Sequence, residues 1–186
     1  MLKANAITKT KDNIIKYLQE FFANKSNYSE YGLDLSEVEI FDKQPLILQN
    51  YPSILITAIN GNYITSGLGD ISQEIYDDDG ECIGYRYSGM LELPVTIEVA
   101  SRTTPERDRL IDLLSITLRV LIRRQLEYEG ILIKDMHYGG ESEIMYDSDK
   151  LYIASIQFTT WSEWYQDVTF LPLKGIDIEY DNNPQR

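Results

Sequence analysis

The chain has 186 residues, of which 43% are hydrophobic, and a formal net charge of −13. This length predicts one domain with a substantial core, and the apolar content argues against disorder. The acidic balance disfavours binding to DNA or anionic membranes, because such binding needs clustered basic side chains. A single cysteine excludes an intrachain disulfide and fits a reducing cytoplasm. No apolar run approaches the roughly 20 residues of a spanning helix.

One helix and two strands are predicted in the first third of the chain. Residues 12–23 carry apolar side chains at helical spacing, with Thr8 or Thr10 available as the N-terminal cap. Residues 36–41 alternate between apolar and polar, and residues 53–59 are rich in β-branched side chains. These two runs are expected to form neighbouring strands.

A long acidic hairpin is predicted at residues 63–88. Its turn contains the dipeptide Asp-Gly, which favours a tight turn, and joins two strand-like runs at 71–76 and 82–87. The turn includes Asp77, Asp78 and Asp79, within a stretch of six carboxylates that contains no basic residue. We expect this hairpin to project from the body. Ordinary solvation explains its charge, but it would also complement a basic surface on a neighbouring molecule.

A strand that leads into a long helix organises the rest of the chain. Residues 91–100 alternate as a half-buried strand, in which Pro94 requires a sheet edge or a bulge. A helix of about six turns follows. Either Thr104 caps it with a proline at the first helical position, or Thr103 and Glu106 form a capping box.

This helix is apolar on two sides, and Gly130 ends it. At about 100° per residue, a broad core stripe is formed by Leu110, Ile111, Leu114, Thr117, Leu118, Leu121 and Ile122. Nearly opposite lies a narrower stripe of Leu113, Ile116 and Val120, flanked by Arg109 and Arg123. A helix that is apolar on both sides is normally buried on both sides. The second stripe is therefore expected to lie under another part of the chain or under a neighbouring subunit.

Arginine is concentrated around this helix. Six of the eight arginines lie between residues 101 and 124, where there is no lysine: Arg102, Arg107, Arg109, Arg119, Arg123 and Arg124. Arginine is favoured where a planar fork pairs with a carboxylate at a contact surface. The concentration favours an interface. The alternative is a solvated helix face with local pairs such as Glu106–Arg109 and Asp112–Arg119.

Two further strands are predicted after the helix. Residues 131–133 begin one strand, before turns at Gly139-Gly140 and at residues 147–149. Residues 151–161 form a long strand that is apolar on both faces, which predicts a central position in the sheet. Residues 166–186 are expected to form an extended arm.

The predicted fold is a single α+β (α/β) domain over residues 1–165. We expect a mixed, mainly antiparallel sheet of four to six strands packed by two helices. The acidic hairpin 63–88 projects from it, and the C-terminal arm 166–186 follows it.

No active site emerges from the sequence. His137 is the sole histidine, and one histidine with one cysteine cannot build a usual zinc site. The run 77–80 resembles a calcium loop, but the twelfth position of an EF-hand would be Arg86. Glu141 and Glu143 form a carboxylate pair with little specificity in so acidic a chain. We therefore predict a protein that is not an enzyme and has no cofactor or metal.

The order of these elements resembles the tail terminator and neck proteins of tailed bacteriophages. The likeness covers residues 12–165. It depends most on Val-Thr-Ile-Glu-Val-Ala-Ser at 95–101, Pro-Glu-Arg-Asp-Arg-Leu-Ile-Asp at 105–112 and Gly-Ile-Leu-Ile at 130–133. These are patterns of a strand–helix–strand unit and carry no catalytic signature.

The resemblance implies a structural virion protein, made in the host bacterial cytoplasm, that forms a homo-oligomeric ring, typically a hexamer. The ring would cap the tail tube at tail completion and join it to the head-proximal neck, leaving a channel through which DNA passes without specific binding. The expected partners are further copies of the chain, the tail tube protein and neck or portal-adaptor proteins, with no membrane. The long hairpin and the C-terminal segment depart from compact terminators, so the chain is either the terminator itself or an adjacent neck or sheath-contacting component.

The predicted subunit interface combines the second helix stripe, its flanking arginines and the acidic turn: Leu113, Ile116, Val120, Arg109, Arg123, Asp77, Asp78 and Asp79. An alternative function, motivated by the net charge of −13 alone, is an acidic inhibitor or DNA mimic that binds basic protein surfaces.

Overall fold

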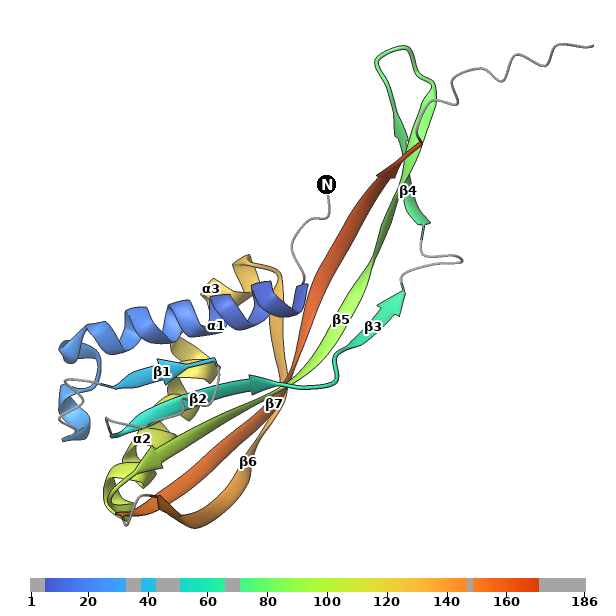
Figure 1. Ribbon diagram of the computed structural model, residues 1–186. Helices are drawn as coiled ribbons and strands as arrows, with labels where there is room; N and C mark the ends of the chain where they lie inside the picture. The colour runs from blue at the N-terminus through green and yellow to red at the C-terminus, as the bar shows by residue number, and fades with distance from the viewer. Residues whose placement is uncertain (1–5, 33–37, 43–50, 66–70, 147–148, 171–186) are drawn as a thin grey trace, which may run out of the picture.

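Two long paired strands set the layout of the molecule (Figure 1). They are β5 (Cys82–Ser101) and β7 (Asp149–Thr169), which pair antiparallel from Gly84 to Ser101 of β5. The structure is a computed structural model that describes residues 6–32, 38–42, 51–65, 71–146 and 149–170. Every other strand is placed by its pairing with this central pair or with a neighbour of it.

Five further strands complete a seven-stranded sheet. They are β1 (Glu39–Phe41), β2 (Ser53–Ala58), β3 (Asn62–Thr65), β4 (Ile71–Tyr76) and β6 (Ile131–Tyr146). The main order is β1-β2-β5-β7-β6, and β3 and β4 pair with β5 beyond β2. Among the described strands, β1 and β2 run parallel and the other pairs are antiparallel. The predicted α+β class is confirmed, although the sheet has more strands than the expected four to six.

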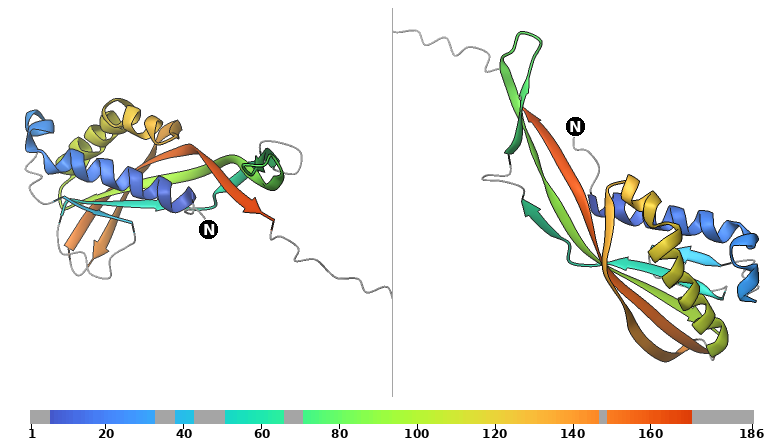
Figure 2. Two further views of the ribbon diagram at one scale, coloured as in Figure 1. Left: turned by 90° about the horizontal axis from the view of Figure 1, so that it is seen from above. Right: turned by 180° about the vertical axis from the view of Figure 1, so that it is seen from behind.

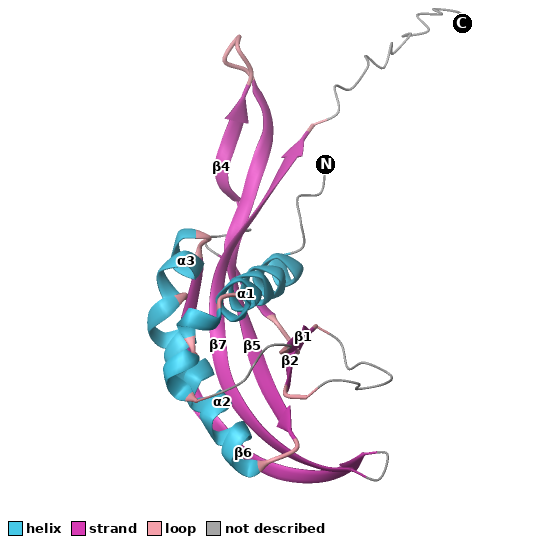
Figure 3. Cartoon of the chain, turned by 90° about the vertical axis from the view of Figure 1, so that its left-hand side faces the viewer, coloured by secondary structure: helices cyan, strands magenta, loops and turns pink. Residues whose placement is uncertain are grey.

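The helices cover one face of the sheet (Figures 2 and 3). They are α1 (Ala6–Ala23), α2 (Thr104–Ile116) and α3 (Arg123–Tyr128), with a π-helical turn, η4 (Thr117–Leu121), between the last two. The core lies between the two layers. The covered face of β5 contributes alternate side chains to it, all almost fully buried: Leu91, Leu93, Val95, Ile97 and Val99.

The first helix starts earlier than the sequence predicts. It begins at Ala6, so neither Thr8 nor Thr10 caps it. Thr10 is instead buried, with its hydroxyl 2.8 Å from that of Ser162 on β7. A threonine hydroxyl on the core face is tolerated here because a second hydroxyl satisfies it.

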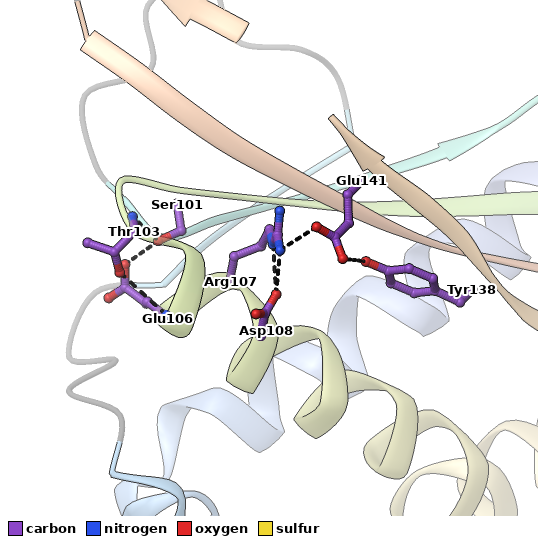
Figure 4. A network of polar contacts seen from close by, with 7 residues as sticks. All are labelled: Ser101, Thr103, Glu106, Arg107, Asp108, Tyr138 and Glu141. Carbon is purple, nitrogen blue, oxygen red and sulfur yellow. Dashed lines mark hydrogen bonds and ion pairs between the residues drawn. The ribbon is translucent and has the colours of Figure 1, made fainter. Parts of the chain in front are cut away.

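The start of α2 follows the second of the two predicted caps. The Thr103 hydroxyl accepts the backbone N–H of Glu106 at 3.4 Å. The Glu106 carboxylate does not return directly to the Thr103 N–H. The Ser101 hydroxyl lies between them, accepting the Thr103 N–H at 3.2 Å and bonding the carboxylate (Figure 4). The end of the helical stretch also agrees with the prediction, since Gly130 has φ +76° and donates to the Glu127 carbonyl.

Pro94 lies in a central strand, opposite a break in the neighbouring ladder. Beside it, the partner of β5 changes from β2 to β3. In the connection, Asn60 has φ +57° and the Ile59 N–H donates to the Pro94 carbonyl at 3.4 Å. The missing proline donor therefore faces a gap between β2 and β3, where this side of β5 is locally an edge. The predicted alternative of a bulge is not what β5 shows, because its ladder with β7 is continuous through Pro94.

The expected turn at Gly139-Gly140 is wrong, because both residues lie inside β6. The β6–β7 ladder skips residues between Lys134 and His137 and again between Tyr138 and Gly140. A Cβ on Gly139 would come within 2.4 Å of the Ser155 hydroxyl. Glycine here permits close strand approach at a bulge rather than a chain reversal.

A third strand, the end of β7, pairs with the acidic hairpin formed by β4 and the first residues of β5. β4, the first residues of β5 and the last residues of β7 form an extension beyond the helices, which we call the arm (Figure 1). Residues 166–169, expected in a separate C-terminal arm, end β7 and pair with residues 84–87. The strand-like run at residues 175–180 lies outside the described residues.

The arm joins the body where β3, β5 and β7 meet at Gly89. A Cβ there would lie 2.3 Å from the Ile64 carbonyl oxygen and 2.9 Å from Trp164 Nε1. We expect Gly89→Ala to lower the free energy of unfolding by about 1–3 kcal/mol, the usual cost of overpacking. Urea denaturation would measure this. Thr169→Ala, at an exposed position of the same arm, should change it by less than about 0.5 kcal/mol.

Candidate interaction surfaces

An exposed apolar ridge runs along the helical layer. It consists of Ile116 at the end of α2 and of Val120 and Leu121 in η4, with 42%, 65% and 46% of their surfaces exposed. Ile116 and Val120 were predicted to lie on the outer stripe, whereas Leu121 was assigned to the core. The core assignment of Leu121 is wrong.

The π-helical turn explains the position of Leu121. In η4 the Ile122 N–H donates to the Thr117 carbonyl, five residues back, at 3.0 Å. Such a turn holds one residue more than an α-helical turn, so later residues are rotated relative to a regular helix. Leu121 therefore points outward, as Val120 does. The buried side chains continue with Ile122 and Leu126.

Leu113 does not belong to the exposed surface, which corrects its predicted place at a subunit interface. Its side chain is 0% exposed and forms part of the chain's own core. One turn earlier, the Arg109 guanidinium donates to the Gly32 carbonyl at 3.3 Å. The connection that follows α1 therefore lies over this side of α2 and covers it from within the chain.

Most of the clustered arginines contact groups of their own chain. Arg119 donates to the Met136 carbonyl at 3.1 Å, and Arg123 pairs with Glu127 at 2.8 Å. Arg102 contacts Asp149 at 3.4 Å. Neither Arg109 nor Arg119 has the local helix partner that the solvated-face alternative proposed. These arginines therefore bind groups of their own chain, from the segment before α2 through α3.

Arg107 is the centre of a polar network that links α2 to β6 (Figure 4). Only 3% of its surface is exposed, and its Nη2 lies 2.6 Å from carboxylate oxygens of both Asp108 and Glu141. The Tyr138 hydroxyl donates to Glu141 at 2.9 Å. Burial alone would lower the pKa of Arg107, but the two carboxylates outweigh it and the pKa is raised. Burial and Glu141 likewise raise the pKa of Tyr138.

The acidic turn lies at the tip of the arm, far from the helical ridge of the same chain (Figure 1). Asp77 has a structural role, because its Oδ1 accepts the backbone N–H groups of Asp79 and Glu81 at 3.1 and 2.8 Å. Asp78 and Asp79 direct exposed carboxylates to solvent. The structure therefore does not bring the three aspartates together with Arg109 and Arg123 within one molecule.

A bidentate ion pair joins two strands of the arm. Arg86 on β5 donates to both carboxylate oxygens of Asp167 on β7, at 2.6 and 2.9 Å. The hydrogen bond to Asp167 raises the pKa of Arg86. This cross-strand pair fixes the two strands in register beyond the helices.

The residues considered for catalysis have structural contacts. His137 lies in a bulge of β6, where its ring nitrogens approach the Asp135 carbonyl at 2.9 Å and the Gln157 side chain at 3.2 Å. Glu143 pairs with Lys150 at 2.6 Å. Within the described residues, no group of three or more His, Cys, Asp or Glu side chains could hold a metal ion. No helix in that part of the chain is long and apolar enough to cross a membrane.

The difference in burial between Leu113 and Val120 can be tested by replacing each with alanine. Leu113→Ala should lower the free energy of unfolding by about 2–5 kcal/mol, because it leaves a cavity in the core. Val120→Ala should change it by less than about 0.5 kcal/mol. Chemical denaturation of the two variants at a concentration where both are monomeric would compare them. Similar losses in both would contradict the assigned burial.

Arg107 can be tested in the same way. Arg107→Ala should lower the free energy of unfolding by about 2–4 kcal/mol, since it removes several charge-assisted hydrogen bonds from a nearly buried site. Arg107→Lys should recover little of this, because an ammonium group lacks the planar fork that reaches both carboxylates. Full recovery by lysine would show that the charge alone matters.

Comparison with known proteins assigns the chain to no family. The sequence matches no protein-family model, and no curated protein matches it. The two surfaces above, the apolar ridge and the acidic arm, are therefore the features from which a function must be argued.

Proposed function

We propose that this chain is a structural subunit that assembles with further copies into a ring at the tail–neck junction of a tailed bacteriophage. The ring caps the tail tube and joins it to the head-proximal neck, with a channel for DNA. The observation that carries the proposal is the exposed ridge of Ile116, Val120 and Leu121 on a chain whose core is already filled.

Exposure of this ridge costs free energy that a neighbouring copy can recover. Complete burial of an aliphatic side chain contributes roughly 1.5–3 kcal/mol, and each of these three is about half exposed. The ridge therefore offers several kcal/mol to a partner. Three adjacent aliphatic side chains on one helical surface are typical of a contact site rather than of scattered surface residues.

The shape of the molecule supports a ring. The ridge lies on the helical body and the arm extends away from it (Figure 1), so the chain has two different exposed surfaces. Contact between unlike surfaces of successive copies is head to tail, and it closes into a ring when the rotation between copies allows. The net charge of −13 also suits a channel through which DNA passes without adhering.

The role of the ridge is tested with the variant Ile116→Asp/Val120→Asp. We expect the unaltered chain to form closed rings, visible by electron microscopy and native mass spectrometry, and the variant to be monomeric with unchanged circular dichroism. Tyr128→Asp is the matched control, because Tyr128 is an almost fully exposed apolar side chain on the same helical stretch. It should still form rings.

Two outcomes would contradict the proposal. Rings formed equally well by the double variant would remove the ridge from the interface. A monomeric chain that binds a DNA-binding enzyme tightly, and loses that binding as salt is raised, would instead favour an acidic inhibitor or DNA mimic.

A further inference from the structure

The face of the arm that continues the core face of the sheet is rich in aromatic side chains, and the chain's described helices do not cover its outer part. It also carries Glu74 and Gln166, opposite Tyr85 and Tyr87. On β5 the buried residues have odd numbers, from Leu91 to Val99, and alternation places Tyr85 on the same face. Residues opposite one another in an antiparallel pair share a face, so Val168, which pairs with Tyr85, lies there too. The rings of Phe170 and Tyr85 contact edge to face, with 5.2 Å between ring centroids.

Nearer the body, the same face carries another aromatic pair. Tyr63, which pairs with Leu91, lies edge-on to Trp164 at 5.8 Å between ring centroids. We call the exposed and half-buried side chains of this face the arm face: Tyr63, Tyr85, Val168 and Phe170. Trp164 is partly buried and packs against the chain's own core. Tyr63, Val168 and Phe170 are each about half exposed.

The chain's own described helices do not reach the arm face. They cover the sheet below the arm, while β5 and β7 continue straight past them (Figures 1 and 3). The ladder between these two strands is uninterrupted from residue 84 to residue 101 of β5, so the arm cannot fold back onto the body without breaking it.

Two hollows lie near the ridge. A hollow of about 280 Å³ lies on one side of it, against α1, and a second of about 230 Å³ lies on the other, against β6. The first is lined by apolar side chains such as Phe21 and Leu121 and by the polar Glu20, Asn27 and Gln125. The second is lined by apolar side chains such as Ile133 and Met136 and by the charged Arg119, Arg123, Lys134 and Asp135. Both are smaller than the roughly 300–1,000 Å³ of small-molecule sites, and their size suits single aromatic or aliphatic side chains.

The charges beside the two surfaces are opposite. Asp78 and Asp79 extend from the tip beyond the arm face, and both are exposed. Arg123 and Arg124 follow the ridge at the start of α3, and both are exposed; Arg123 also pairs with Glu127 of its own chain at 2.8 Å. Complementary charge at the edge of an apolar contact orients the partners and suppresses wrong pairings.

We infer that the arm face of one copy packs on the ridge of the next copy, with Asp78 and Asp79 beside Arg123 and Arg124. This inference rests on the proposed ring and names the two surfaces that would form each contact within it. Each of the two surfaces is then covered by the other surface of a neighbouring copy, as a head-to-tail assembly requires.

Site-directed cross-linking tests the contact directly. In a Cys82→Ser background, chains with Val120→Cys are mixed with chains with Val168→Cys and treated with a short bis-maleimide. We expect a cross-linked dimer on a denaturing gel. The control replaces Val168→Cys with Thr169→Cys, which lies next to it but on the opposite face of the arm. Its yield should be at least about tenfold lower.

A charge exchange provides a second measurement. Asp78→Lys/Asp79→Lys and Arg123→Glu/Arg124→Glu should each weaken self-association by about tenfold or more in sedimentation equilibrium, and their combination in one chain should restore most of it. Asp77 is left unchanged because it holds the turn. None of the four side chains is buried, so loss of folding is not expected, and circular dichroism would verify this.

The outcomes separate this inference from the proposed function. If rings form but Val168→Cys cross-links no better than Thr169→Cys and the combined charge variant does not recover, the arm contact is wrong and the ring stands. If cross-linking and recovery occur but the assemblies are open chains, the arm contact stands and the ring is wrong. A chain that is monomeric and not cross-linked at all tested concentrations contradicts both.

Discussion

The uninterrupted ladder between β5 and β7 is the constraint on which the rest of the structure depends. One half of it lies under the helices, where alternate side chains of both strands form the core. The other half has no helical cover, and its strands are held by backbone hydrogen bonds and by cross-strand contacts such as Arg86–Asp167. Because a single ladder spans both halves, the arm is a rigid extension of the core sheet, and its position relative to the helices is determined by the twist of the sheet.

The π-helical turn has a comparable influence on the helical surface. It separates α2 from α3 and leaves Leu121 exposed beside Ile116 and Val120, where a regular helix would bury it. Thr117, at the start of the turn, has a buried hydroxyl without a hydrogen-bond partner among the described residues. π-Helical turns inside helices are frequent at functional sites, and here the turn forms the surface that we propose as a subunit contact.

Some charged side chains hold the fold together, and others are exposed to solvent. Arg107 is nearly buried and its carboxylate partners are half exposed, so this network connects the first turn of α2 to the outer strand β6. Arg123 and Arg124 are exposed on the other end of the helical stretch. Asp77 likewise organises the hairpin turn while its two neighbours extend into solvent. In the hairpin turn, therefore, one carboxylate maintains the fold and its two neighbours remain exposed.

The sequence by itself determined the local elements. Alternation of apolar and polar residues predicted the strands around Val95 and Ile156. The Thr-Thr-Pro-Glu sequence and Gly130 marked the start and end of the helical stretch, and the dipeptide Asp-Gly predicted the hairpin turn. Each of these signals depends only on neighbours within a few residues. The tertiary structure alone decided which apolar side chains remained outside. Leu113 is buried because it packs into the chain's own core, and Leu121 is exposed because a π-helical turn shifts the helix. It also decided that Gly139 lies at a bulge rather than a turn, since only the pairing of β6 with β7 distinguishes the two.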